Sequence, residues 1–139
     1  MAFTIRAIRP DEIDAARRLL LAGGWDGPRV EPDHFGQLVA NARNAVVAVD
    51  DDRVIGFARA LGDGLSNGYL SMLVVDAACR EQGVGRALVE HVMGDNPDMT
   101  WVLRARGEVQ AFYEKLGFSR SVVAMERVRK IPSDPGVIE

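Results

Sequence analysis

Two glycines between two arginines form the part of this sequence best suited to chemistry. Residues 80–89 read REQGVGRALV, with Gly83 and Gly85 one residue apart between Arg80 and Arg86. The apolar residues that follow recur every four positions, which is typical of a helix. The first turn of a helix offers unbonded N–H groups and a positive dipole end to a phosphate, and glycines leave those groups uncovered. The stretch therefore predicts a phosphate-binding turn, the alternative being an ordinary glycine turn into a capped helix.

Two common phosphate motifs do not fit this stretch. A P-loop needs lysine and then serine or threonine after its last glycine, whereas Arg86 and Ala87 follow Gly85. A dinucleotide-binding fingerprint needs a third glycine where this chain has Leu88. No acidic residue ends a predicted strand about 20 residues later, as that fingerprint also requires.

The elements that position the glycine stretch follow from apolar periodicity and turn residues. A strand–turn–strand pattern at 44–50 and 54–61 predicts a hairpin. The strand–helix–strand unit at 69–105 predicts two parallel strands with a right-handed crossover. The full order predicts an α/β (α+β) fold with a mixed sheet and helices on both faces. The remaining predictions are strands at 3–9 and 120–128, and helices that begin at Pro10, span 32–42, and span 109–116.

Two motifs in order resemble the GNAT-type N-acetyltransferase superfamily. Arg80-x-x-Gly83-x-Gly85 fits its Q/R-x-x-G-x-G/A signature and follows a strand that ends in VVD at 74–76. Downstream, AFYEKLGF at 111–118 is similar to a second segment of the superfamily. The resemblance covers about residues 3–128 and implies the GNAT acyl-CoA N-acyltransferase fold. It implies acetyl-CoA as co-substrate, no metal, and direct attack of an amine on the thioester.

The resemblance also implies how the coenzyme is held. The strand edge that pairs with the pantetheine arm consists of Leu73, Val74 and Val75, whose side chains are expected in the core. The backbone amides that bind the pyrophosphate belong to Arg80, Glu81, Gln82, Gly83, Val84, Gly85 and Arg86.

Tyr113 is the catalytic acid that the resemblance implies, because the matching tyrosine of the family lies near the CoA sulfur. A tyrosine of pKa about 10 donates a proton to a thiolate of pKa about 8.5 only slightly uphill. Tyr113 also falls on an apolar helix face with Val109, Phe112 and Leu116, so a packing role is the alternative.

The general base is not identified by the sequence. Freeing an alkylamine of pKa about 10.4 at pH 7 costs about 4.6 kcal/mol. Where many family members carry a carboxylate, this chain has Ser71 and Met72. Asp63, Asp76 and Glu108 are nearby alternatives, as is a water chain, although Asp63 in a glycine-rich turn is expected to cap that turn.

Several other residues invite a functional role and have an ordinary alternative. Arg106 stands where many family members have asparagine, and with Arg104 it could meet CoA phosphates or simply face solvent. Cys79 lies beside the loop but is expected to be structural, since direct transfer needs no thiol. Three residues of the acceptor-side segment could line a pocket or pack in the core: Trp25, His34 and Phe35.

Composition limits the class of protein. The 139 residues fit one domain, taken as 1–128 with a flexible tail at 129–139. A net charge of −3 argues against a general nucleic-acid binder, and no apolar run approaches a membrane span. One cysteine and a charged N-terminus favour a cytoplasmic protein. We therefore expect an N-acetyltransferase acting on a small-molecule or peptide amine, with dimerisation frequent in the superfamily. The alternative is a non-catalytic acyl-CoA-binding regulatory module.

Overall fold

A five-stranded sheet forms the centre of the computed structural model, which describes residues 2–130. The strands lie in chain order across the sheet, and each neighbouring pair is antiparallel except the last, which is parallel. The predicted hairpin and the predicted parallel pair are both confirmed. The strands are β1 (Thr4–Ala7), β2 (Asn44–Asp50), β3 (Arg53–Gly62), β4 (Asn67–Val75) and β5 (Thr100–Leu103).

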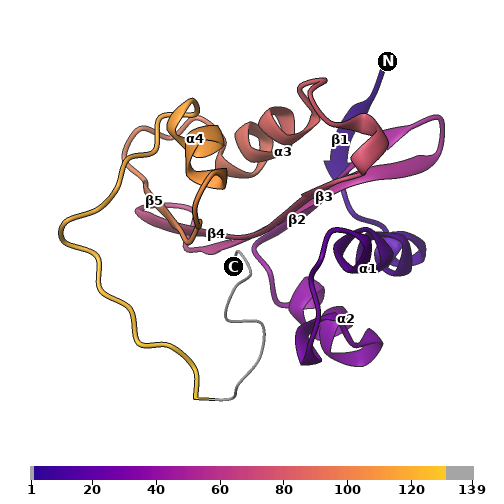
Figure 1. The fold of residues 1–139 in the computed structure, drawn as a ribbon, viewed down its shortest axis with the longest axis horizontal. Coiled ribbons are helices and arrows are strands. Elements are labelled where there is room, and N and C mark those ends of the chain that lie inside the picture. Colours follow the sequence, from indigo (N-terminus) through magenta and orange to yellow (C-terminus); the bar gives the residue numbers. More distant parts are fainter. Residues whose placement is uncertain (1, 131–139) are drawn as a thin grey trace.

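Helices cover both faces of this sheet, as the element order predicts (Figure 1). On one face lie α1 (Ile13–Ala22) and α2 (Pro32–Ala40), and on the other lie α3 (Val84–Met93) and α4 (Val109–Glu114). Three short 3-10 turns complete the element list: η1 (Pro10–Glu12), η2 (Pro28–Val30) and η3 (Ala77–Cys79). Within the part of the chain that the structure describes, no helix has the length and apolar character needed to cross a membrane.

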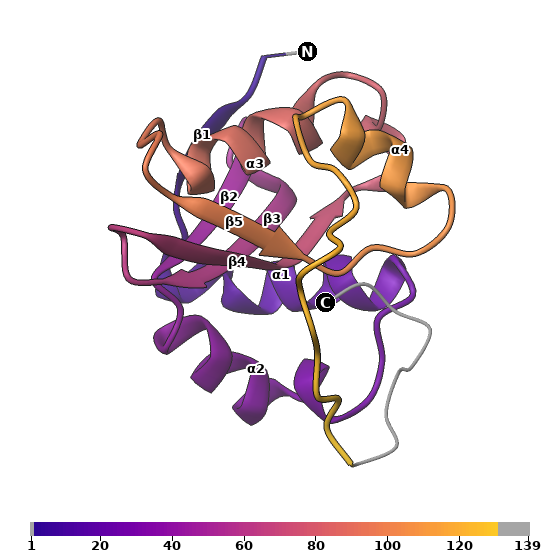
Figure 2. The same cartoon turned by 90° about the vertical axis from the view of Figure 1, so that its left-hand side faces the viewer.

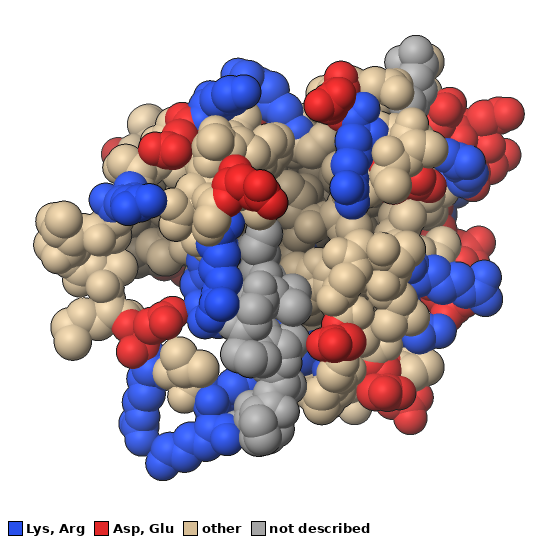
Figure 3. All heavy atoms as spheres, in the orientation of Figure 1, with Lys and Arg blue, Asp and Glu red and all other residues tan. Residues whose placement is uncertain are grey.

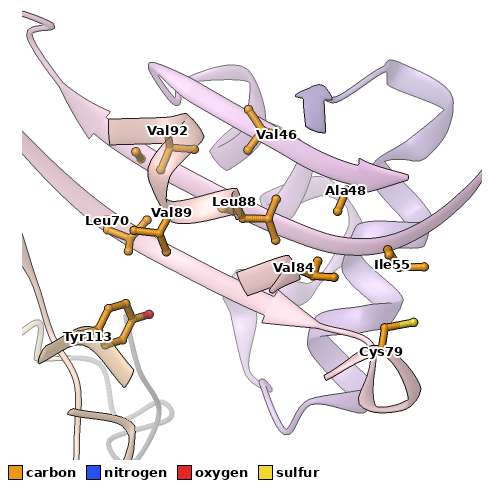
Figure 4. Close-up of a cluster of buried hydrophobic side chains, with 12 residues drawn as sticks. Val46, Ala48, Ile55, Leu70, Cys79, Val84, Leu88, Val89, Val92 and Tyr113 are labelled. Carbon is orange, nitrogen blue, oxygen red and sulfur yellow. The ribbon is translucent and has the colours of Figure 1, made fainter. Parts of the chain in front are cut away.

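Two buried clusters hold the layers together. The cluster under α3 contains Val84, Leu88 and Val89 of the helix, and Tyr113 of α4 belongs to the same cluster (Figure 4). The cluster under α1 and α2 includes Phe35, whose ring lies 5.5 Å from that of Phe57 in an edge-to-face contact. Burial on both faces explains why β3 and β4 read as near-continuous apolar runs.

The predicted strand at 120–128 is wrong. Residues 119–130 form no helix or strand and are exposed, with Val122 98% and Met125 97% exposed. In Figure 1 this segment runs as an extended trace beyond the edge of the sheet, and in the view of Figure 2 it crosses the end of β5. The apolar run at 122–125 expresses a local preference, and a strand also needs a neighbour to receive its hydrogen bonds. Most of the predicted tail, 129–139, lies outside the described residues.

Candidate functional site

The loop before α3 presents a row of backbone amides. Gly83 caps the helix in the left-handed region at φ 83°, and Glu81 has φ 62°. The amide of Ala87 bonds to the carbonyl of Gly83 at 3.0 Å. Among the described residues, the backbone amides of 80–86 donate no hydrogen bond to a backbone oxygen of a turn or loop. The amides of this group that belong to α3 lie before the first i→i−4 bond of the helix, so they have no partner within it. The site has the donors that a diphosphate requires.

The side chains of this loop point largely into solvent. Arg80, Glu81 and Gln82 are exposed, whereas Val84 is buried beneath the helix. Arg86 pairs with Glu90 one turn later, Nε to Oε1 at 3.2 Å, and both side chains are more than half exposed. The positive charge of Arg86 is therefore shared with a carboxylate, and the backbone supplies the fixed donors of the loop.

Gly85 connects the two motifs physically. A Cβ at this position would lie 3.2 Å from Cζ of Phe112 and 3.7 Å from Cγ2 of Val75. The distance to Phe112 is tighter than ordinary van der Waals contact, so the absence of a side chain lets α4 lie close against the start of α3. Sequence reasoning assigned Gly85 to the ligand side alone, and the structure gives it a packing role as well.

A split opens between β4 and β5 beside this loop. The two strands pair only from Asn67–Thr100 to Leu70–Leu103, after which they separate toward their C-terminal ends (Figure 2). The predicted coenzyme edge, Leu73 to Val75, pairs with β3 on its other side and lies beyond the last pair with β5. Its side chains belong to the two cores, so its backbone is the part that can receive an added extended chain.

A bulge in β4 lies at the start of the split. The register with β3 shifts between Arg59 and Ala60, leaving Ser71 as the extra residue on β4. Ser71 is buried, and its Oγ accepts a hydrogen bond from Nη1 of Arg59 at 2.6 Å. Bulges redirect side chains, and this one places Ser71 with Arg59 and Met72 on the α1/α2 side of the sheet.

Tyr113 lies on α4 with its side chain almost fully buried, 3% exposed. Its ring contacts Phe112 and Phe118 edge-to-face, with centroids 5.0 and 5.8 Å away. Burial raises the pKa of Tyr113 to about 12, because the phenolate would lose its hydration. Tyr113 also lines a pocket of about 510 Å³ bounded by β5, α4 and the segment after Phe118. The residue is at once a packing side chain and a protonated donor.

The three candidate bases, Asp63, Asp76 and Glu108, lie in different parts of the fold. Asp63 closes the turn between β3 and β4: Oδ1 accepts from the amides of Leu65 and Ser66, both at 2.8 Å, and of Asn67 at 3.1 Å. These bonds hold the pKa of Asp63 far below its ordinary value. Asp63 therefore caps a turn and is unsuited to take a proton at neutral pH.

The other two carboxylates lie at element ends. Asp76 begins η3, where Oδ1 accepts from the amide of Ala78 at 2.9 Å. Glu108 is exposed at the N-terminus of α4. The described residues thus provide no carboxylate within the bulge, and a water chain is the remaining alternative of those that the sequence offers.

The ordinary alternatives fit the acceptor-side residues and Cys79. Trp25 and Phe35 are buried in the core under α1 and α2, while His34 is exposed. Cys79 is buried and free, with Nη2 of Arg53 3.5 Å from its sulfur. Arg106 is exposed. Packing explains the burial of Trp25 and Phe35, and the surroundings of Cys79 do not require any chemistry of its thiol.

Two buried arginines were missed from the sequence. Arg29 and Arg59 are 8% and 7% exposed and line the same pocket as Ser71. A signal existed for Arg59, because a single charge interrupts the apolar strand VIGFARAL at 54–61. Arg29 lies in the short 3-10 turn η2, which has no apolar periodicity to mark the residue as buried.

Comparison with known proteins places this geometry in a family. Residues 41–120 match the family model for the acetyltransferase (GNAT) domain. This span contains the hairpin, the glycine loop, the split and Tyr113. The chain belongs to the GNAT acetyltransferase family, and the superfamily predicted from its two motifs is confirmed.

Individual relatives agree with this assignment. The chain is 37% identical over 70 residues to serotonin N-acetyltransferase 2 of Oryza sativa, covering 48% of this chain and 35% of the relative. It is 36% identical over 74 residues to the peptidyl-lysine N-acetyltransferase YjaB of Escherichia coli, covering 52% and 47%. It therefore matches less than half the length of these curated relatives. A GNAT family acetyltransferase from Streptococcus pneumoniae has the same fold, with a TM-score of 0.70, 22% identity, and 93% and 98% of the two chains covered.

Proposed function

We propose that this protein transfers the acetyl group of acetyl-CoA to a primary amine by direct attack. One observation supports the proposal most directly. β4 and β5 separate after the Leu70–Leu103 pair, next to amides at the start of α3 that donate to no backbone oxygen among the described residues. A diphosphate on those amides would place the pantetheine arm along the outer edge of Leu73 to Val75. The thioester would then enter the split.

The reaction forms one bond and breaks another. The amine nitrogen attacks the thioester carbonyl carbon, the C–S bond breaks, and the electron pair leaves with the CoA sulfur. The amine proton passes to water, since none of the three candidate carboxylates, Asp63, Asp76 and Glu108, lines the pocket at the bulge. Relatives of this chain that are named as N-acetyltransferases, one of them a peptidyl-lysine N-acetyltransferase, support an amine as acceptor.

Tyr113 is proposed to stabilise the leaving thiolate. Full proton transfer from a group of pKa about 12 to a thiolate of pKa about 8.5 would cost about 5 kcal/mol. A hydrogen bond from the hydroxyl to the sulfur avoids that cost and still lowers the energy of the developing charge. The raised pKa keeps the hydroxyl protonated, and thus a donor, throughout the neutral range.

The proposal is tested by CoA release from acetyl-CoA across a broad panel of amines. We expect one or more amines to accelerate release, and Tyr113→Phe to lower kcat by about 10- to 100-fold while leaving the Kd for CoA unchanged. Phe112→Leu serves as a control for disturbed packing on the same helix. Binding of CoA without release by any amine would contradict the proposal and favour a non-catalytic acyl-CoA-binding module, which the absence of a bulge carboxylate would suit.

A further inference from the structure

The outer edge of β5 is open. β5 is the last strand in the sheet order, and no described strand pairs with its far side. The amide of Thr100 donates to the carbonyl of Ser66 on the β4 side at 2.8 Å. Backbone groups alternate in direction along a strand, so those of Trp101 and Leu103 face outward. Such an edge is a template for pairing with another extended chain.

A groove of about 510 Å³ runs along this edge. It is bounded by β5 and the residues that continue it to Arg106, by the part of α4 around Tyr113, and by the segment after Phe118. Val102, on β5 itself, is 42% exposed. The edge is therefore bordered by an unfilled cavity and not by side chains packed across it.

The C-terminal segment, residues 119–130, lies next to this groove without filling it. Residues 119–128 make no backbone–backbone hydrogen bond within the described part of the chain, and the whole segment is exposed. Val122, Val123 and Met125 are 98%, 86% and 97% exposed. Figure 3 shows uncharged atoms that project from the left-hand side of the molecule, where Figure 1 places this segment. The segment is thus an extended chain whose apolar side chains face water.

The exposed apolar side chains gather at the segment and the edge. Seven large hydrophobic side chains are exposed among the described residues, and five of them belong to the C-terminal segment or to β5. Val128 and Val102 complete this group of five. The other two, Leu21 and Leu65, lie on α1 and in the turn between β3 and β4. A group of exposed apolar side chains marks an interaction surface, whereas isolated ones need no explanation.

We propose that the C-terminal segment pairs with the outer edge of β5 in a second copy of this chain, and that the exchange is reciprocal. Each molecule has one segment and one edge, so a two-fold axis would satisfy both segments and both edges. In the described structure the chain's own segment crosses the end of β5 instead, where Oε2 of Glu126 lies 2.9 Å from Nε of Arg104 (Figure 2). The segment and the edge together approach the roughly 20 residues a side of a standard interface.

The second copy would cover the groove beside Tyr113. Successive side chains of an added strand point to opposite faces, so Val122 and Val123 would gain neighbours on different sides of the sheet. Val102 would gain cross-strand neighbours, which stabilise paired strands. Apolar surface that now faces water would be buried, and this burial is the main driving force for association. The interface does not require the proposed acetyl transfer.

Sedimentation of the full chain without ligands tests the interface. We expect a dimer that dissociates only in or below the micromolar range. Val122→Asp and Met125→Asp should each raise the dissociation constant at least about tenfold, since a buried charge is costly and each change is present twice in the dimer. Both side chains are almost fully exposed in the protomer, so neither change should unfold it. Leu65→Asp alters another exposed apolar side chain, far from the edge in sequence, and should keep the wild-type constant.

A mixing experiment distinguishes a segment–edge contact from a contact between two segments. Val102→Lys places a charge on the edge, leaves the segment intact, and should also weaken the dimer. A mixture of Val102→Lys and Met125→Asp should form more heterodimer than either variant forms homodimer. Both substitutions then fall on one contact, with opposite charges, and the other contact carries none. If two segments bind each other, Val102→Lys will behave as the wild type and the proposed pairing is wrong.

The outcomes separate the interface from the proposed function. A protein that stays monomeric at about 100 μM would overturn the interface, including the case in which the segment pairs with its own β5. Association that both segment variants leave unchanged would overturn it as well. Either result leaves the proposed acetyl transfer untouched. A dimer that passes these tests but releases no CoA from acetyl-CoA would support the interface and contradict only the proposed function.

Discussion

The ring of Phe112 occupies the space that a side chain at position 85 would need. Its Cζ lies 3.2 Å from the position that a Cβ on Gly85 would take. The glycine belongs to the loop that is proposed to bind the coenzyme, and the phenylalanine belongs to the helix that carries Tyr113. The two motifs by which the family is recognised therefore form one packed unit, and the loop amides are fixed relative to Tyr113. Changes at this contact should alter both the start of α3 and the position of α4.

We predict that Gly85→Val lowers the free energy of unfolding by about 1–3 kcal/mol, the usual cost of overpacking. Phe112→Leu in the same chain should relieve the overlap, so the double variant should be more stable than the sum of the single changes indicates. Urea unfolding of the four proteins measures this coupling. Strict additivity would show that the contact is not what requires glycine at position 85.

Gly83→Ala tests whether the loop backbone binds the coenzyme. Gly83 has φ 83° with open space around it, so alanine should cost about 1–2 kcal/mol through backbone strain alone. Gly94, at the other end of α3, has φ 67° and equally open surroundings. The ψ of Gly94 is −155°, in a region that is almost restricted to glycine, so Gly94→Ala should cost at least as much stability as Gly83→Ala. We expect Gly83→Ala to weaken CoA binding by about tenfold or more and Gly94→Ala to leave it unchanged. Equal effects on the Kd would point to stability as the cause.

The buried hydroxyl of Tyr113 should make stability fall in alkali. Below pH 10 the phenol is protonated in both the folded and the unfolded chain, and it adds no pH dependence. Between pH 10 and about 12 the unfolded chain loses the proton while the folded chain keeps it. The free energy of unfolding should then fall by about 1.4 kcal/mol per pH unit relative to Tyr113→Phe, which keeps the ring. Parallel stability curves for the two proteins in this range would contradict the burial of the hydroxyl.

Asp63→Asn distinguishes a turn cap from a catalytic base. The lowered pKa of Asp63 gives stability that is present above its unfolded pKa of about 4 and is lost as the pH falls below it. The variant should thus have a lower urea midpoint at pH 7 and a weaker acid dependence, while kcat stays at the wild-type value. A large loss of kcat with unchanged stability would instead return Asp63 to the candidate bases.

Much of the fold and part of the site could be predicted because they depend on local pattern. The hairpin, the start of α3 at Val84 and the parallel pair follow from apolar spacing and glycines close in sequence. The bulge at Ser71 could not be predicted, because it arises from the register between two strands. Burial of Arg29 likewise depends on elements far apart in the chain. The apolar run at 122–125 was misleading, since the outer edge of β5 borders a pocket in this structure and not a sixth strand.

Calorimetry with CoA and with pantetheine tests the central claim most directly, because the two ligands share the arm and thiol but only CoA has the diphosphate. We predict that CoA binds to the wild-type protein, that pantetheine binds at least about tenfold more weakly, and that Gly83→Ala removes most of this difference. No heat with CoA, or equal affinity for the two ligands, would contradict a diphosphate site at the start of α3.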